Sequence, residues 1–189
     1  ARGNSGVILS LLFRGISKKL QTAEICDGVL WADALQEGVD AAYKAVMKPA
    51  EGTILTVARL AAAKARAAAQ ENNYFEFVHE AAIEEAKIAL ANTTNQNPVL
   101  KKAGVVDAGG KGWLVALEAM LCALRGEDII APESGAAEVK AAADFSDFDT
   151  DDITFTYCTE FIISRENDMD TEPLRAFLDS LGDSLVLVD

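Results

Sequence analysis

Apolar residues recur every three or four positions through most of the first 126 residues of this chain. Such patterns occupy residues 8–20, residues 22–48 and an alanine-rich stretch at residues 53–70. This spacing places the apolar side chains on one face of an α-helix, and alanine has the highest helix propensity of all residues. The pattern therefore predicts amphipathic helices that pack together through their apolar faces.

Four further helices are expected on the same grounds, at residues 74–90, 98–103, 113–125 and 173–181. Gly104 and Gly126 follow the second and the third of these. Glycine often ends a helix because it adopts a left-handed backbone conformation without strain. The fold class predicted for residues 1–126 from these patterns is therefore mainly α, built from amphipathic helices.

The pattern changes after Gly126. Residues 127–152 are acidic and small and show no periodicity, which is typical of a linker. Residues 153–161 alternate apolar and polar side chains as a half-buried β-strand does, and residues 184–188 begin a second strand. Two strands and one helix cannot bury a sheet face, so residues 153–189 are expected to form an incomplete α+β segment.

The distribution of charge supports the same division. Residues 1–126 carry 14 Lys and Arg against 13 Asp and Glu, whereas residues 127–189 carry 3 against 17. The formal net charge of −13 therefore belongs to the C-terminal third. No basic stripe is present that would neutralise a phosphate backbone, which argues against nucleic acid as a partner.

The cysteines indicate a reducing compartment. Cys26, Cys122 and Cys158 are an odd, scattered set without CxxC spacing, which does not suit a disulfide framework. All three are expected to pack against apolar neighbours, although Cys158 beside Glu160 also has the chemistry of a zinc ligand. The sequence shows no signal peptide and no membrane-spanning apolar run, so a cytoplasmic location is expected.

The first candidate site is the segment Gly3, Asn4, Ser5 and Gly6, which runs directly into a helical pattern. A phosphate binds well at a helix N-terminus, where backbone N–H groups point outwards and the helix dipole favours negative charge. Asn4 and Ser5 add polar side chains, and the glycines let the backbone approach an anion closely. The same residue types are common helix caps, so the segment by itself leaves both interpretations open.

The second candidate is the segment from Asp107 to Gly112, which has three glycines in four positions. That is more than a simple turn needs, and each glycine costs conformational entropy. Asp107 has the chemistry to cap a helix or contact a ribose, and Lys111 has the reach to contact a phosphate. The GxxxxGK[ST] spacing of a Walker A loop is absent. A turn that lets helices pack closely is the alternative.

Thr53 and His79 are weaker candidates for a functional role. Thr53 is most simply the N-cap of the alanine-rich helix, and Glu51 beside it is most simply a solvated charge. His79 has no acidic or cysteine partner at ligand spacing, so a position at the surface or the edge of the core is expected.

Several stretches, taken in order, resemble one family. Residues 1–10 (ARGNSGVILS), 44–57 (KAVMKPAEGTILTV) and 104–112 (GVVDAGGKG) resemble the DhaL-like domain of bacterial fatty acid kinase ATP-binding subunits. That domain is related to the nucleotide subunit of dihydroxyacetone (glycerone) kinases. Residues 157–161 (YCTEF) and 182–186 (GDSLV) resemble the start of the middle domain of the same ATP-binding subunits.

The resemblance implies a barrel of antiparallel helices that holds Mg-ATP in loops at one end. The residues that it implicates are Gly3, Asn4, Ser5, Gly6, Thr53, Asp107, Ala108, Gly109 and Gly110. Asn4, Ser5 and Gly6 would face the phosphates, Thr53 would line the pocket, and the last four would close over the nucleoside. A separate fatty-acid-binding protein would present an acyl carboxylate to the γ-phosphate, and the product would be an acyl phosphate.

The chain departs from the family at both ends. The aspartates that bind Mg²⁺ in the family lie in a GDTG-type segment before Ala1, and a His-Val-His segment of the middle domain would follow Asp189. No catalytic residue and no metal ligand is therefore assigned in this chain, and alone it is not expected to turn over ATP. The alternatives are the nucleotide subunit of a dihydroxyacetone kinase and a non-catalytic helical lipid-binding or scaffold module, and a homodimer is left open.

Overall fold

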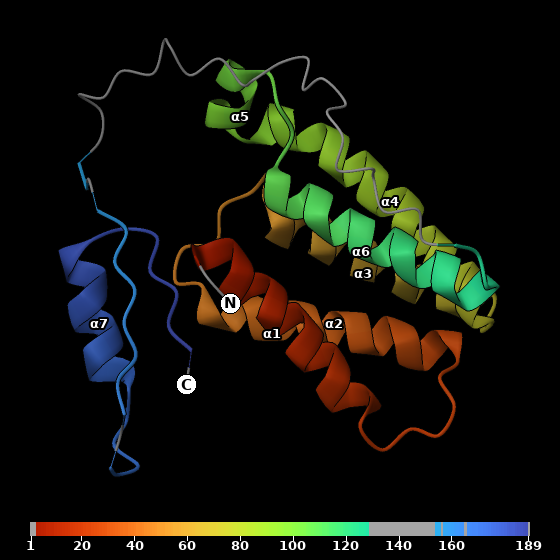
Figure 1. The fold of residues 1–189 in the computed structure, drawn as a ribbon, viewed down its shortest axis with the longest axis horizontal. Helices are drawn as coiled ribbons and strands as arrows, with labels where there is room; N and C mark the ends of the chain where they lie inside the picture. Colours follow the sequence, from red (N-terminus) through yellow and green to blue (C-terminus); the bar gives the residue numbers. More distant parts are fainter. Residues whose placement is uncertain (1–2, 129–153, 156, 165, 189) are drawn as a thin grey trace.

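The computed structural model describes residues 3–128, 154–155, 157–164 and 166–188 (Figure 1). The helices of these residues are α1 (Gly3–Leu20), α2 (Gly28–Ala45), α3 (Ile54–Glu71), α4 (Phe75–Gln96), α5 (Pro98–Ala103), α6 (Ala108–Arg125) and α7 (Glu172–Leu181). The mainly α fold predicted from the apolar pattern is confirmed. None of the helices within the described ranges has the length and apolar character that a membrane span requires.

The helices up to α4 pack in chain order, each against the next, and α6 lies on α3 and α4 (Figure 1). Small residues let them approach closely. Ala58, Ala62 and Ala65 of α3 are buried. A Cβ atom on Gly15 of α1 would lie 2.5 Å from the Cα atom of Gly38 in α2. The apolar faces therefore meet with backbone almost in contact with backbone.

Most helix ends agree with the local signals. Thr53 is the N-cap of α3, and Gly104 and Gly126 follow α5 and α6 with φ angles of 67° and 69°. The start of α2 was predicted six residues too early. It lies at Gly28, because the Asp27 side chain accepts a hydrogen bond from the Leu30 N–H at 2.8 Å and caps the helix there.

The predicted position of His79 was wrong. Its side chain is fully buried in the core, where its Nδ1 atom accepts a hydrogen bond from Trp31 Nε1 at 3.0 Å. Its Nε2 atom lies 2.9 Å from the Leu117 carbonyl oxygen, to which it donates. A Trp N–H can only donate and a carbonyl can only accept, so the ring is neutral with its proton on Nε2. His79 thereby connects α2, α4 and α6.

The C-terminal region differs from the expectation. Helix α7 is present as predicted, but neither predicted strand forms among the described residues, and residues 157–164 have no regular secondary structure. In place of the second strand there is one isolated antiparallel bridge between Val46 and Val186. A strand needs a neighbour to accept its backbone hydrogen bonds. Here the Met47 N–H donates to the Leu185 carbonyl at 3.4 Å and the Leu187 N–H donates to the Ala45 carbonyl at 3.3 Å. Most of the predicted linker, from residue 129 to residue 152, lies outside the described residues.

Candidate functional site

The N-terminal ends of α1, α3 and α6 lie at the same end of the helical bundle (Figure 1). We call this the loop end and define it as residues 3–6, 47–53 and 104–110. Every residue that the sequence assigned to nucleotide binding lies within these three segments. Helix N-termini expose backbone N–H groups and the positive end of the helix dipole, so an anion is favoured at the loop end.

The first turn of α6 is formed by the second glycine-rich segment. Asp107 is the N-cap, and its Oδ2 atom accepts a hydrogen bond from the Gly110 N–H at 2.6 Å. Gly109 and Gly110 thus belong to the helix and not to a turn before it, which corrects the sequence interpretation. A Cβ atom on Gly109 would lie 3.3 Å from Ile54 Cβ, and one on Gly110 would lie 2.9 Å from Val57 Cγ2. The glycines therefore let α6 pack closely on the first turn of α3.

The loop before α3 is held against the end of α4. Gly52 has a φ angle of +74°, and a Cβ atom on it would lie 2.9 Å from the carbonyl oxygen of Thr93. Only glycine combines that backbone angle with so close an approach. The Thr53 hydroxyl donates a hydrogen bond to the Ala50 carbonyl at 2.9 Å. Thr53 is half-buried, and the next residue, Ile54, lies against Gly109 in the first turn of α6.

A network of side chains that the sequence did not indicate fixes the same loop. The Thr56 hydroxyl accepts a hydrogen bond from the Gly52 N–H at 3.0 Å and donates one to Glu51 Oε2 at 2.9 Å. The Glu51 carboxylate is exposed, as predicted for a solvated charge, but it also pairs with Arg59 Nη2 at 2.8 Å. Arg59 Nε donates to the Tyr43 hydroxyl at 3.0 Å, and this bond, with the charge of Glu51, raises the pKa of Arg59.

The first glycine-rich segment also lies inside its helix, because α1 begins at Gly3. The Gly3 N–H donates a hydrogen bond to Glu160 Oε1 at 2.6 Å, and Asn4 Nδ2 donates one to the Ser184 carbonyl at 3.0 Å. Asn4 and Ser5 are exposed, and Gly6 is half-buried. The start of α1 thus holds a negatively charged oxygen, which belongs to the C-terminal part of the chain.

Electrostatics distinguish the starts of α1 and α6. The Asp107 carboxylate is part of the first turn of α6 and would repel a phosphate, whereas it can accept hydrogen bonds from ribose hydroxyls. Gly110 is buried and its N–H is already bonded to Asp107, so it shapes the site without facing a ligand. At α1 the anion is the side chain of a distant residue, Glu160, which another anion can displace. The backbone N–H groups at the start of α1 and at the start of α6 therefore each already bind a carboxylate of this chain.

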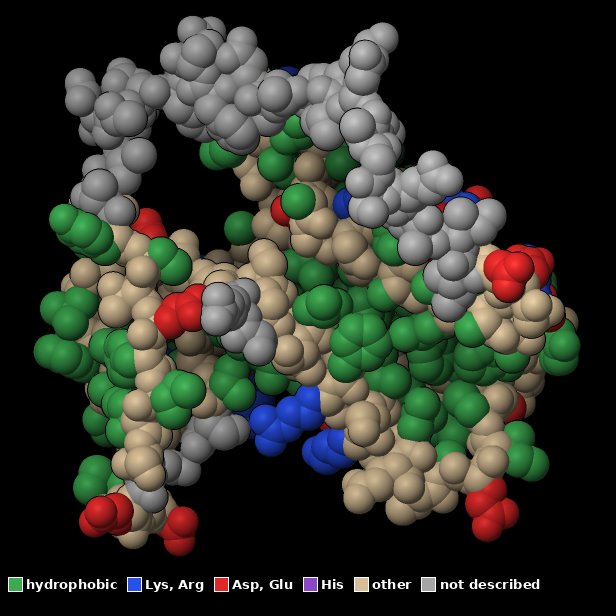
Figure 2. Space-filling model, in the orientation of Figure 1, with side chains coloured by type: hydrophobic (Ala, Val, Ile, Leu, Met, Phe, Trp, Pro, Cys, Tyr) green, Lys and Arg blue, Asp and Glu red, His purple; other side chains and the backbone are tan. Residues whose placement is uncertain are grey.

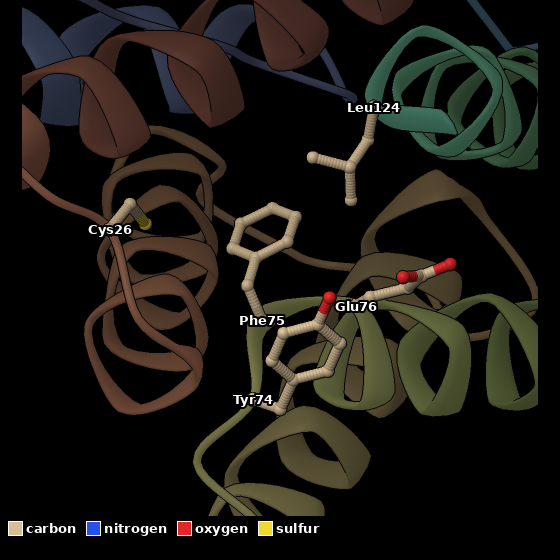
Figure 3. A pocket seen from close by; sticks show the side chains of 5 residues that line it. All are labelled: Cys26, Tyr74, Phe75, Glu76 and Leu124. Atoms are coloured by element: carbon tan, nitrogen blue, oxygen red, sulfur yellow. The ribbon is translucent and has the colours of Figure 1, made fainter. Parts of the chain in front are cut away.

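A cavity of 280 Å³ lies at the other end of the bundle, where α4 begins and α6 ends (Figure 3). It is lined by Cys26, Tyr74, Phe75, Glu76 and Leu124. Burial, with a smaller effect from the Asp27 charge, raises the pKa of the Cys26 thiol, so the thiol is less readily deprotonated than in water. Apart from Glu76, which pairs with Arg125, the lining carries no charge. Such a cavity does not suit a triphosphate.

A second cavity of 600 Å³ lies between α4 and α6. It is lined by Glu80, Ile83, Glu84, Lys87, Glu118, Leu121, Cys122 and Arg125. Lys87 pairs with Glu84 at 3.0 Å and with Glu118 at 3.6 Å, and Arg125 pairs with Glu80. Three carboxylates outnumber two paired cations, so this cavity is equally unsuited to a phosphate.

Hydrophobic side chains gather over α1 and α6 in the view of Figure 2. The exposed large ones on these helices are Phe13, Val115 and Leu124. An apolar face does not neutralise phosphate charge, so this face does not suit a phosphate either.

Metal chemistry has little support in the described ranges. No three His, Cys, Asp or Glu side chains in them lie close enough together to hold a metal ion. Cys158 is exposed, which corrects the expectation that it packs against apolar neighbours, and Cys26 and Cys122, expected to fill the core, are only partly buried. The residues in these ranges therefore do not fit the Mg²⁺ site that the family implies.

Two families match the chain in sequence. The DAK2 domain matches residues 1–122, which is well over half of the chain. The chain belongs to the DAK2 domain family. The FakA-like middle domain of fatty acid kinases matches residues 154–189. The DAK2 domain thus covers α1 to most of α6, and the resemblance drawn from the short motifs is confirmed for both regions.

Curated bacterial proteins resemble the chain along its whole length. Protein YloV of Bacillus subtilis is 44% identical, and uncharacterized proteins of Staphylococcus saprophyticus and Staphylococcus haemolyticus are each 43% identical. Each alignment covers all of this chain but 36% of the relative. The chain therefore spans just over a third of the length of these relatives.

Proposed function

We propose that this chain is the nucleotide-binding part of a kinase subunit that transfers the γ-phosphate of ATP to a fatty acid. The fatty acid would be presented by a separate fatty-acid-binding protein, and the product would be an acyl phosphate. The observation that carries the proposal is the order of the two family matches, a DAK2 domain followed by a fatty acid kinase middle domain. A reaction that consumes ATP also fits a cytoplasmic protein.

The geometry of the loop end supports particular roles. Asn4 and Ser5 are exposed at the start of α1, where the helix dipole would favour the phosphates. Thr53 would line the pocket, and Asp107 would accept hydrogen bonds from the ribose. In the reaction a carboxylate oxygen of the fatty acid forms a bond to the γ-phosphorus, the bond to the β–γ bridging oxygen breaks, and ADP leaves. Such a transfer needs positioning and charge neutralisation more than covalent help from the protein.

In this family Mg²⁺ would supply charge neutralisation at the β- and γ-phosphates. We propose that the residues that would bind it lie upstream of this chain, as the resemblance to the family implies. The 189-residue chain alone is therefore expected not to turn over ATP. Metal-dependent phosphate release by the purified chain would overturn that expectation.

The nucleotide subunit of a dihydroxyacetone kinase is the second candidate. It shares the DAK2 domain, but it does not account for the match of residues 154–189 to the FakA-like middle domain. An acyl-phosphate assay on the whole protein, with a fatty-acid-bound partner in one reaction and dihydroxyacetone in another, separates the two. Phosphorylation of the ketose alone would reject the fatty acid proposal.

Nucleotide binding is tested by thermal unfolding of the chain with and without ATP. A ligand at one hundred times its dissociation constant stabilises the folded state by about 2.7 kcal/mol. Ser5→Ala is expected to weaken ATP binding by about tenfold, because hydrogen bonds to charged groups are stronger than neutral ones.

Ser10→Ala is the matched control. Ser10 lies on the same helix, and its hydroxyl bonds to the Gly6 carbonyl within α1. This variant should bind ATP like the wild type. The proposal fails if ATP does not stabilise the wild type, or if Ser5→Ala and Ser10→Ala bind ATP equally well.

A further inference from the structure

We infer that Thr93, a buried residue in the last turns of α4, is a positioning residue for the nucleotide site. It contacts the loop before α3 and the loop before α6, and so holds two segments of the loop end in one arrangement. The inference rests on the proposed function, since the segments that Thr93 holds are those assigned to the nucleotide. Nothing in the sequence pattern singles this residue out.

The hydroxyl of Thr93 holds the start of α6. It accepts a hydrogen bond from the Asp107 N–H at 3.1 Å. Asp107 is the residue whose carboxylate caps α6 at Gly110. The bond therefore fixes the backbone of the capping residue itself, and with it the direction in which the Asp107 side chain points.

The backbone of Thr93 holds the loop before α3. Its carbonyl oxygen lies against Gly52, where a Cβ atom would come within 2.9 Å of it. Gly52 directly precedes the N-cap Thr53, and its N–H is bonded to the Thr56 hydroxyl. One residue of α4 thus contacts both segments, one through its side chain and the other through its carbonyl.

The next residue strengthens the first of these contacts. The Thr94 hydroxyl donates a hydrogen bond to the Val105 carbonyl at 3.0 Å. Two consecutive threonines of α4 therefore bind the segment that connects α5 with α6, at two points two residues apart. Such a connection restricts the loop more than either bond does alone.

A threonine in a helix often bonds only to its own helix. Thr93 does so as well, since its hydroxyl donates to the Leu90 carbonyl at 2.6 Å. That bond uses the hydroxyl hydrogen, and the oxygen remains free to accept the Asp107 N–H. The Thr93 hydroxyl can therefore donate to Leu90 and accept from Asp107 at the same time, and only the bond with Asp107 involves the loop end.

Thr93→Val tests the inference, because valine keeps the branched shape and removes the hydroxyl. Thr93→Ser keeps the hydroxyl and serves as the conservative rescue. In the variant with valine, the Asp107 amide loses its partner and is expected to exchange its hydrogen about tenfold faster. ATP affinity is expected to fall several-fold in the same variant and to stay near the wild-type value with serine.

Val78→Ala is the control for a merely structural effect. Val78 is fully buried in the first half of α4, far from the loop end, so this variant should lower thermal stability without changing the Asp107 exchange or the ATP affinity. The inference is overturned if Thr93→Val leaves the Asp107 exchange unchanged, or if Val78→Ala reproduces its effect on that exchange. Hydrogen exchange of the Asp107 amide is measured without nucleotide. If the wild type does not bind ATP, the proposed function is rejected, but the exchange experiment still decides whether Thr93 holds the start of α6.

Discussion

Many large apolar side chains of the helical region, residues 3–126, are buried, whereas none is buried among the described residues of the C-terminal region, residues 154–188. In the helical region Leu12 and Leu117 are at most 1% exposed. In the C-terminal region Tyr157 is 91% exposed and Ile162 is 99% exposed. Both regions supply apolar residues at regular spacing, so composition alone does not explain the difference.

The difference lies in the partners that each region finds. Helices of 18 to 22 residues present long faces that cover one another. The C-terminal region contacts the helical region at a few, mostly polar, points. These include the ion pair of Lys48 with Asp179 at 3.1 Å and the hydrogen bond of Gly3 with Glu160. An apolar pattern therefore stabilises a fold only where a matching face is available.

The sharpest test of this contrast compares two truncations. Leu117→Ala is expected to lower the free energy of unfolding by about 2 to 5 kcal/mol, because it removes buried methyl groups and leaves a cavity. Ile162→Ala should change it by less than about 0.5 kcal/mol, since that side chain is already in water. Urea unfolding followed by circular dichroism measures both. Equal losses would show that Ile162 is buried in solution and would remove the contrast.

A smaller effect concerns pH and belongs to the helical region alone. Burial lowers the pKa of His79 below its ordinary value, although the Leu117 carbonyl and Glu80 act in the opposite direction. Above about pH 6.5 the His79 ring is neutral in both the folded and the unfolded chain, so its burial does not make the free energy of unfolding depend on pH. Below about pH 6.5 His79 binds a proton in the unfolded chain but not in the folded chain. The free energy of unfolding therefore falls by at most about 1.4 kcal/mol per pH unit.

The measurement is the difference in unfolding free energy between the wild type and His79→Gln from about pH 7.5 to about pH 5, the range in which a histidine titrates. Glutamine can still accept from Trp31 and donate to Leu117 but does not titrate in this range. The wild type is therefore expected to lose more stability than the variant as the pH falls. Parallel curves for the two proteins would contradict a neutral, buried His79.

The smallest expected effect is on ATP affinity, and it comes from a contact between the C-terminal and the helical region. Glu160→Gln removes the negative charge that occupies the start of α1. If phosphates bind there, ATP affinity should rise about two- to fivefold, as about 0.3 to 1 kcal/mol is typical for a charge at a helix end. Glu166→Gln, on the same segment, is the control and should leave the affinity unchanged. A lower affinity of Glu160→Gln would show that this carboxylate assists the nucleotide.

Local signals account for much of the helical region. Thr53, Gly104 and Gly126 end or begin helices as their residue types predict, because a cap acts on backbone groups within one turn. The start of α2 could not be predicted in this way. Asp27 caps it, and Asp27 is itself held by Asn73 Nδ2 at 2.9 Å, a residue 46 positions away.

In the candidate site, too, some features could be predicted from the sequence and others depend on residues far apart in the chain. The sequence and its resemblance to a family indicated all three segments of the loop end. They did not indicate Glu51, Arg59 or Thr93, because charged and hydroxyl residues on a helix are usually solvated or bonded locally. Glu160 was noticed only as a neighbour of Cys158, and its contact with Gly3 spans 157 residues.

The amino-acid sequence by itself determined that this chain forms amphipathic helices, roughly where they lie, and which family it belongs to, because periodicity, caps and short motifs are properties of neighbouring residues. Only the tertiary structure decided that His79 is a core residue and that neither expected strand forms among the described residues, apart from one bridge of Val186 with Val46. It also decided that Thr93 connects two loops. These three results depend on which residue, distant in the sequence, accepts a hydrogen bond or covers an apolar face. A local sequence pattern does not contain that information.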